Sequence, residues 1–311
     1  MDEAEKYSIG PFQVSARAVA LAALVLGAVN IGLSPIFVRL ADVGPVSSAF
    51  WRLALAAPLL LVWVRLGAAR RRRAAGAHPL PPAAPARPRM LLLCGVFFAA
   101  DLGLWHWSIT LTTVANATLL ANLNAVFVTL GGFLLFGERV RGLFIIGLVL
   151  AFAGAAALMG ASLEFAPQRL TGDLLGVATA VMYASYILSA KALRRRYSAA
   201  EVTLYIATVT AAILLPIAIA SGEQVLPASA AGWLPLAGLA VICQIMGQGF
   251  IIHALAHLPA AFSALTLLIQ PVVAALVAWL LFAEALGALE LAGAALVLAG
   301  IFLARFGSRQ G

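Results

Sequence analysis

The chain has 311 residues, of which 63% are hydrophobic and only 10% are charged, and its mean hydropathy is +1.03. A soluble domain is apolar over roughly half of its residues, so this composition excludes a soluble protein and indicates an integral membrane protein. The net charge of +8 would fit a nucleic-acid-binding protein, but the positions of the basic residues give it another explanation.

Apolar runs of about 20 residues, the length that crosses a membrane as a helix, follow one another along the chain. None alternates strictly between apolar and polar residues, as a barrel strand would, so the predicted fold class is an all-α membrane protein. After a polar tail at 1–16, ten transmembrane helices are predicted at about 18–38, 45–66, 90–110, 114–136, 143–162, 172–191, 200–220, 232–252, 260–282 and 286–304. The Arg- and Pro-rich segment 67–89 is predicted to be a solvated loop.

The basic residues predict the orientation of these helices. Most of the 20 Lys and Arg residues fall in segments on the same side as the N-terminus, whereas Arg39 and Arg169 fall on the other side and Arg52 lies within a helix. Because cytoplasmic connections carry the excess of Lys and Arg, both termini are predicted to be cytoplasmic. This topology accounts for the positive charge, so no nucleic-acid partner is expected.

One motif occurs twice. The letters LLFGER at 134–139 recur as LLFAEA at 280–285, so that Glu138 corresponds to Glu284. We therefore divide the chain into a first five-helix repeat at 17–163, a second at 164–305 and a C-terminal tail at 306–311. Because five is an odd number, the second repeat is predicted to be inverted in the membrane, which is a common design of secondary transporters.

Paired glycines follow each copy of the motif. Gly147 and Gly154 correspond to Gly293 and Gly300, and each pair is spaced to lie on one helix face. Two interpretations are open: the glycine faces pack within one chain, or they pack between two chains. The oligomeric state, monomer or homodimer, is therefore not predicted.

Polar side chains share faces of several predicted helices. Because such groups are costly when they face lipid, they are expected to point to the interior of the bundle. The candidates for a substrate cavity are Asn30, Ser34, Thr118, Asn122, Tyr183, Tyr186, Gln244, Gln248, Ser263, Thr266 and Gln270. The alternative is that they form hydrogen bonds between helices, each worth well under about 2 kcal/mol.

Two charged side chains lie inside predicted helices. Asp101 is near the centre of the third helix, with Trp105 one turn further along the same face, and Arg52 is in the second helix. A carboxyl group in the middle of a membrane is a candidate proton carrier or a partner for a substrate ammonium, so we expect Asp101 to matter for transport or its coupling. The alternative is a structural ion pair with Arg52.

The sequence resembles the ten-helix drug/metabolite transporter superfamily, in particular bacterial EamA-type exporters. The resemblance is carried by FLLFGER and LLFAEA, by the glycine-paired helix after each, and by GDLLGVATAVMYASYILSAKAL at 172–193. It implies a cavity between the two halves, lined by the first, third, fourth, sixth, eighth and ninth helices, with the fifth and tenth outside. Where family members often have Pro in the fourth helix this chain has Asn124, whereas Pro271 is present in the ninth, so the fourth helix is expected to be less kinked.

The resemblance implies a multi-pass protein of the bacterial inner membrane that exports amino acids, including aromatic and other neutral ones, or similar metabolites by alternating access. Its partners would be this small-molecule substrate and membrane lipid. No HExxH, GxSxG or GKS motif and no metal-ligand cluster is present, so no enzyme activity, cofactor or metal is expected. Two alternatives are open: an efflux carrier for drugs or other metabolites, and a non-transport membrane scaffold.

Overall fold

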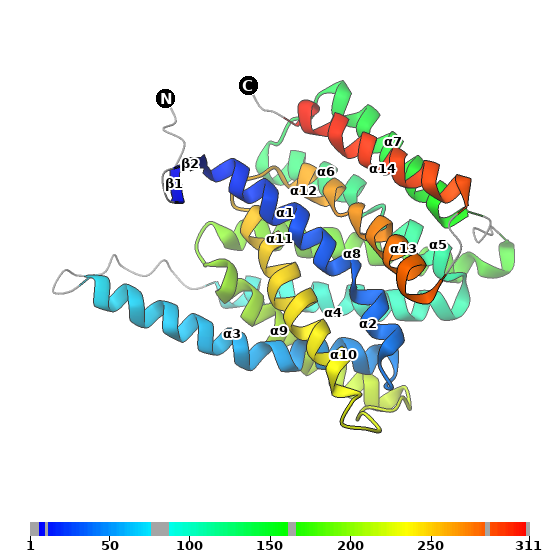
Figure 1. The fold of residues 1–311 in the computed structure, drawn as a ribbon, viewed down its shortest axis with the longest axis horizontal. Helices are drawn as coiled ribbons and strands as arrows, with labels where there is room; N and C mark the ends of the chain where they lie inside the picture. Colours follow the sequence, from blue (N-terminus) through cyan, green and yellow to red (C-terminus); the bar gives the residue numbers. More distant parts are fainter. Residues whose placement is uncertain (1–5, 10–11, 76–86, 161–165, 284–286, 309–311) are drawn as a thin grey trace.

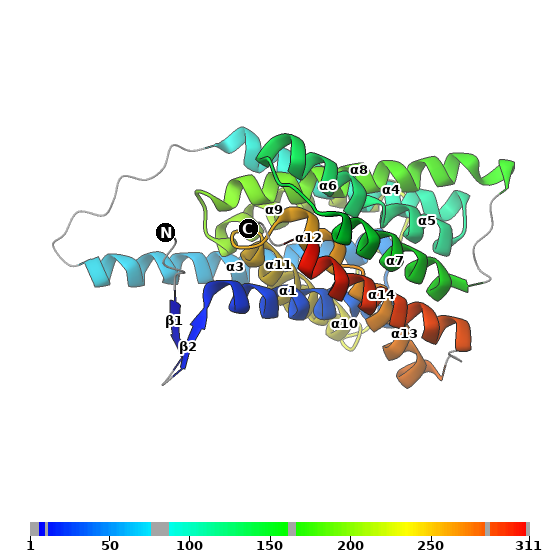
Figure 2. The ribbon, with the colours of Figure 1, turned by 90° about the horizontal axis from the view of Figure 1, so that it is seen from above.

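The computed structural model describes residues 6–9, 12–75, 87–160, 166–283 and 287–308. Within these ranges, ten helical spans are long and apolar enough to cross a membrane, as predicted. They form one bundle, in which the start of the first span and the end of the last span lie at the same end (Figures 1 and 2). An even number of spans, each antiparallel to the one before, brings the two termini to one end.

Four of the spans are interrupted, so they contain more than one helical element. The spans are α1 (Ala16–Gly32) with α2 (Ser34–Leu40), α3 (Pro45–Ala75), α4 (Pro88–Leu111), α5 (Val114–Ala121) with α6 (Asn124–Phe136), α7 (Gly142–Met159), α8 (Leu170–Arg194) after the 3-10 turn η2 (Pro167–Arg169), α9 (Ala199–Ala220), α10 (Trp233–Gly238) with the π-helix η3 (Leu239–Gln248) and α11 (Gly249–Ala254), α12 (Ala260–Thr266) with α13 (Ile269–Phe282), and α14 (Ala288–Gly307).

The structure adds a strand pair to the predicted tail and corrects the expectation for the predicted loop. In the predicted tail, β1 (Lys6–Ile9) and β2 (Phe12–Ser15) pair as antiparallel strands. The predicted loop 67–89 is helical in its first part, because α3 continues to Ala75 and projects beyond the bundle (Figure 1). Arg is a good helix former and neither Gly nor Pro occurs between 68 and 75, so a solvated helix forms there without any apolar periodicity.

The expectation that the fourth span is less kinked than the ninth is wrong. Both are broken over two residues, at 122–123 and at 267–268. In the ninth span the break precedes Pro271, which has no N–H for the preceding turn. In the fourth span Asn124 has a comparable effect, because its side-chain Nδ2 donates to the carbonyl of Ala121 at 2.9 Å and competes with the helix backbone.

The duplicated motif ends its helix in the same way in both copies. Gly137 follows α6 in a left-handed conformation with φ 66°, and Ala283 takes the same place after α13 with φ 54°. A left-handed residue at this position terminates a helix, and glycine adopts it without a side-chain penalty. Glu284 itself lies outside the described residues.

The paired glycines pack within the chain. α7 and α14 lie side by side along one edge of the bundle (Figures 1 and 2). A Cβ atom added at Gly147 would lie 2.5 Å from the carbonyl oxygen of Gly300, and one added at Gly154 would lie 2.6 Å from that of Gly293. Only glycine allows the two backbones to approach so closely.

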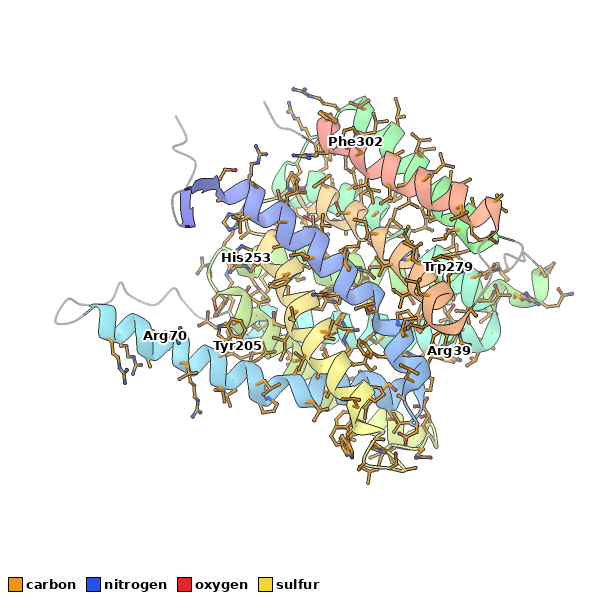
Figure 3. All side chains as sticks on the ribbon, in the orientation of Figure 1. Arg39, Arg70, Tyr205, His253, Trp279 and Phe302 are labelled. Atoms are coloured by element: carbon orange, nitrogen blue, oxygen red, sulfur yellow. The ribbon has the colours of Figure 1, made fainter. Side chains whose placement is uncertain are left out.

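Large apolar side chains cover the outside of the bundle. Leu134, Leu135, Leu280 and Leu281 are each more than 60% exposed, and Figure 3 shows side chains projecting from the outer helices all around the ribbon. A contiguous apolar surface of this extent marks a surface that faces lipid. Trp63, on the outer face of α3, is exposed in the same way.

We expect Gly154→Ala to destabilise the protein, because its Cβ would also meet the backbone nitrogen of Val297 at 2.6 Å and force α7 and α14 apart. Overpacking of this kind costs about 1–3 kcal/mol. The unfolding temperature of the purified protein in detergent, followed by tryptophan fluorescence, measures the effect. Gly142→Ala is the control, because no atom lies within 4 Å of its added Cβ; equal effects of the two variants would contradict the prediction.

Candidate functional site

A cavity of about 620 Å³ lies between the two halves of the chain. It is in the size range of small-molecule sites, and apolar and polar side chains both line it. Eight of the thirteen candidate residues line it: Ser34, Asp101, Trp105, Thr118, Asn122, Tyr183, Gln248 and Gln270. Elements that are distant in sequence thus converge on one space.

The cavity opens toward the face opposite the termini. Its lining residues include Arg39 near the end of α2, Pro45 at the start of α3 and Met159 at the end of α7. On α4 the lining residues begin at Phe98 and continue to Ile109 near the end of the helix. We call this side the opposite face, and we call the side that carries the termini the terminal face.

At the terminal face, a buried carboxylate joins the two halves. Glu138, only 7% exposed, accepts hydrogen bonds from the backbone N–H of Ala260 at 2.9 Å and of Ala261 at 3.4 Å, at the start of α12. It also forms an ion pair with Lys191 of α8 at 2.5 Å, and Lys191 donates to the carbonyl of Leu258 at 2.8 Å. These contacts, which we call the Glu138 latch, join the end of α6 to two elements of the second half.

Five candidate residues do not line the cavity. Ser263 and Thr266 donate to carbonyls one turn earlier in their own helix. Gln244 is buried and accepts from Arg52, and the carbonyl of Asn30 accepts from Cys243. Of these four residues, only Gln244 forms the side-chain hydrogen bond between helices that the alternative interpretation describes.

Tyr186, the fifth of these residues, lies directly behind the cavity wall. It is fully buried, and its hydroxyl donates to Oε1 of Gln248 at 3.3 Å. Its ring packs at a centroid distance of 4.7 Å against Phe98 and of 5.5 Å against Tyr183, both of which line the cavity. Tyr186 therefore supports lining residues and does not itself face the cavity.

Asp101 and Arg52 both line the cavity, but they form no ion pair within the described structure. Arg52 instead donates from Nε to Oε1 of Gln244 at 3.0 Å, which fixes its guanidinium against η3. The wide turns of η3 place both Gln244 and Gln248 toward the interior, and π-helical segments are frequent at functional sites. The two charges are close enough to interact electrostatically.

Sequence reasoning missed several lining residues, including Arg39, Ser48, Arg52, His106, Asn124 and Thr179. The expected set of lining helices is also incomplete, because α3 and the last turn of α7 contribute. The first turns of α3 pack against η3 and so bring Ser48 and Arg52 inward. The position of Arg52 inside a span was a usable signal, because a charged side chain there normally faces the interior.

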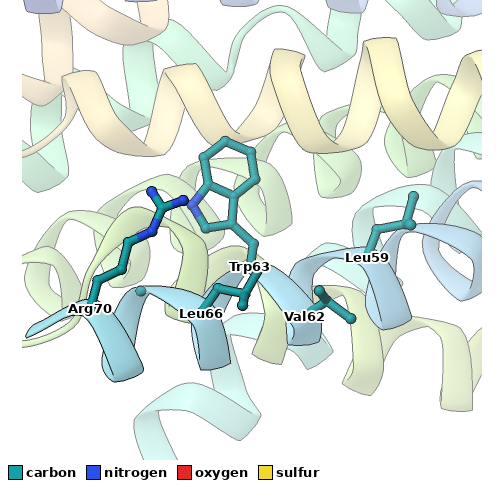
Figure 4. A pocket seen from close by; sticks show the side chains of 6 residues that line it. Leu59, Val62, Trp63, Leu66 and Arg70 are labelled. Carbon is teal, nitrogen blue, oxygen red and sulfur yellow. The ribbon is translucent and has the colours of Figure 1, made fainter. Parts of the chain in front are cut away.

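A second hollow lies on the outside of α3 and, unlike the central cavity, is lined by a single helix. Figure 4 shows Leu59, Val62, Trp63, Leu66 and Arg70 along one face of this helix, with the Arg70 side chain extending toward the indole of Trp63. All of its lining residues come from α3. The hollow is therefore part of the outer surface and not a chamber between the halves.

The fold is shared with a protein of known crystal structure. That chain superposes with a TM-score of 0.71 at 21% identity, over 93% of this chain and 98% of the other. The fold and the cavity define a multi-pass membrane protein. A family model described as the EamA-like transporter family matches residues 18–160 and again 170–306, so the chain belongs to this transporter family.

Curated relatives carry transporter names. An uncharacterized transporter of Archaeoglobus fulgidus is 27% identical over 86% of this chain and 91% of its own length. The pseudopaline exporter CntI of Pseudomonas aeruginosa is 29% identical over 67% of this chain and 72% of its own. A probable terminal-alkyne amino-acid exporter of Streptantibioticus cattleyicolor is 30% identical over 70% and 74%.

The cavity can be tested with single cysteines at equivalent places in the two halves. Thr118 on α5 lines it, whereas Ala264, its counterpart on α12, is 2% exposed. We expect Thr118→Cys to react with a water-soluble maleimide in detergent on the order of tenfold faster than Ala264→Cys, because thiol reactivity requires access. The wild type sets the background, since Cys94 and Cys243 are buried; equal rates would exclude the cavity as described.

Proposed function

We propose that the protein exports amino acids or related small metabolites across the bacterial inner membrane, by alternating access around the central cavity. The observation that carries the proposal is a cavity of about 620 Å³ whose largely apolar wall includes Asp101, Arg52 and several amides. It is open to one face, and the Glu138 latch closes the other. A scaffold protein has no need of an open cavity with charged and polar groups in its wall.

The relatives support an exporter of amino-acid-like substrates. One is named for the export of pseudopaline and another for the export of a terminal-alkyne amino acid. The cavity offers one carboxylate, several amides and the aromatic rings of Phe98, Trp105 and Tyr183. This mixture fits a small polar molecule with an apolar side chain better than a large lipophilic drug.

We further propose that the terminal face is cytoplasmic. Arginines gather at the helix ends there, in the last turns of α3, α8 and α14 and around the start of α7. Short cytoplasmic connections carry this excess of basic residues. The structure then corresponds to an outward-open state, ready to release substrate.

The contacts between α7 and α14 support a two-fold relation between inverted repeats. Gly147 faces Gly300, while its repeat counterpart Gly293 faces Gly154. Such a crosswise exchange of equivalent positions is what a two-fold axis produces. Two related halves can form two mirrored conformations, which is the basis of alternating access.

Transport into proteoliposomes of the purified protein tests the function. We expect saturable uptake of labelled neutral amino acids that unlabelled amino acids compete, and a loss of at least about tenfold in Asp101→Asn if the carboxylate holds the substrate ammonium. An imposed proton gradient then shows whether uptake is coupled through Asp101. Uptake of lipophilic cations without any uptake of amino acids would favour the alternative of drug efflux.

The Glu138 latch leads to a prediction about which face of the cavity is open. Glu138→Gln removes the charge that pairs with Lys191, so we expect it to favour opening of the terminal face. Labelling of Ala264→Cys should then become faster and labelling of Thr118→Cys slower, by similar factors. Glu201→Gln is the control, because this carboxylate on the same face accepts from Ser198 at the start of its own helix. Two rates that change in the same direction would argue against alternation.

A further inference from the structure

Buried polar atoms without partners are concentrated on the cavity wall. Arg52 Nη2, Ser48 Oγ, Asn122 Nδ2 and Asn124 Oδ1 are buried and have no hydrogen-bond partner among the described residues, and all four residues line the cavity. A buried polar group without a partner costs free energy, so such groups are rare in folded proteins. Their collection in one place indicates that a polar ligand completes them.

Arg52 is the charged member of this set. The residue is only 7% exposed, and the bond from Nε to Gln244 holds the guanidinium in place while Nη2 has no protein acceptor in the described structure. A guanidinium is always protonated and offers its N–H groups in a fixed plane that matches a carboxylate. The free edge of Arg52 is therefore a preorganised donor for an anion.

Ser48 extends this donor set. It lies four residues before Arg52 on α3, which places both side chains on the same helix face. Its hydroxyl is fully buried, lines the same cavity and has no partner among the described residues. The hydroxyl of Ser48 and Nη2 of Arg52 can donate to the two oxygens of one carboxylate.

On this basis we propose that Arg52 and Ser48 form the subsite for the substrate's carboxylate, opposite Asp101, which receives its ammonium group. The substrate class is then a zwitterion with a free carboxylate, such as an α-amino acid, and not a simple amine or an organic cation. The inference rests on the proposed function and deepens it. Asp101 and Arg52 thus provide the two opposite charges that a zwitterion requires.

The experiment uses proteoliposomes of the full-length protein and labelled L-phenylalanine, chosen because Phe98, Trp105 and Tyr183 line the cavity. Competition is measured with three unlabelled ligands: L-phenylalanine, 2-phenylethylamine, which lacks the carboxylate, and 3-phenylpropionate, which lacks the ammonium group. The variants are Arg52→Gln, Ser48→Ala and Asp101→Asn. Arg305→Gln, an exposed arginine in the last turn of α14, is the control.

We expect Arg52→Gln to lower the apparent affinity for L-phenylalanine by at least about tenfold, because this ligand loses a charged hydrogen bond. The apparent affinity for 2-phenylethylamine, which has no carboxylate, should stay within about twofold of the wild-type value. Ser48→Ala should show the same selectivity with a smaller loss. Asp101→Asn should show the reverse pattern and spare 3-phenylpropionate. This selectivity distinguishes a ligand contact from a structural role. Loss of a structural role would lower the apparent affinity for all three ligands together.

Two outcomes would overturn the inference while transport stands. One is wild-type protein in which 2-phenylethylamine competes as well as L-phenylalanine. The other is that Arg52→Gln lowers the apparent affinities for L-phenylalanine and 2-phenylethylamine equally, or lowers neither. If the wild type shows no saturable uptake of L-phenylalanine, nor of L-leucine as a second probe, the proposed function fails and the inference fails with it.

Discussion

Polar groups inside a membrane must find partners in the protein, because no water is present to replace a missing hydrogen bond. Most of the protein obeys this constraint through backbone helices, through local bonds such as those of Ser263 and Thr266, and through bonds between helices such as that of Arg52 to Gln244. The cavity is the exception, since its wall holds Arg52, Ser48, Asn122 and Asn124 with unpartnered atoms in the described structure. These unpartnered atoms lower the stability of the protein, and a bound ligand that pairs with them would restore it.

The same constraint explains how the two halves are joined. Where α7 meets α14, glycine alone permits the backbone contact that replaces side-chain packing. At the terminal face, the carboxylate of Glu138 accepts from three N–H donors, those of Lys191, Ala260 and Ala261. Lys191 also donates to the carbonyl of Leu258. The first contact is made between two backbones, and the second is made between charged side chains and helix N–H groups.

Much of the fold was predictable from local sequence. The ten spans follow from the length of the apolar runs, and the duplication, which the family model matches twice, was visible in LLFGER and LLFAEA. The break before Pro271 has a local cause as well. The break before Asn124 was not foreseen, because a side chain that bonds its own helix backbone has no distinctive sequence pattern. The helical extension of α3 to Ala75 was missed for a similar reason, since apolar periodicity does not report a helix in solvent.

For the site, the order of residues along the chain indicates which groups are available in the membrane: a carboxylate at Asp101, a guanidinium at Arg52 and a set of amides and hydroxyls. Which of them share the cavity depends on how the helices pack. Gln244 and Gln248 lie one turn apart, yet the first binds Arg52 behind the wall and the second lines the space. Helical spacing places residues on a face, but the neighbouring helices decide what that face meets, and this depends on packing between segments distant in sequence.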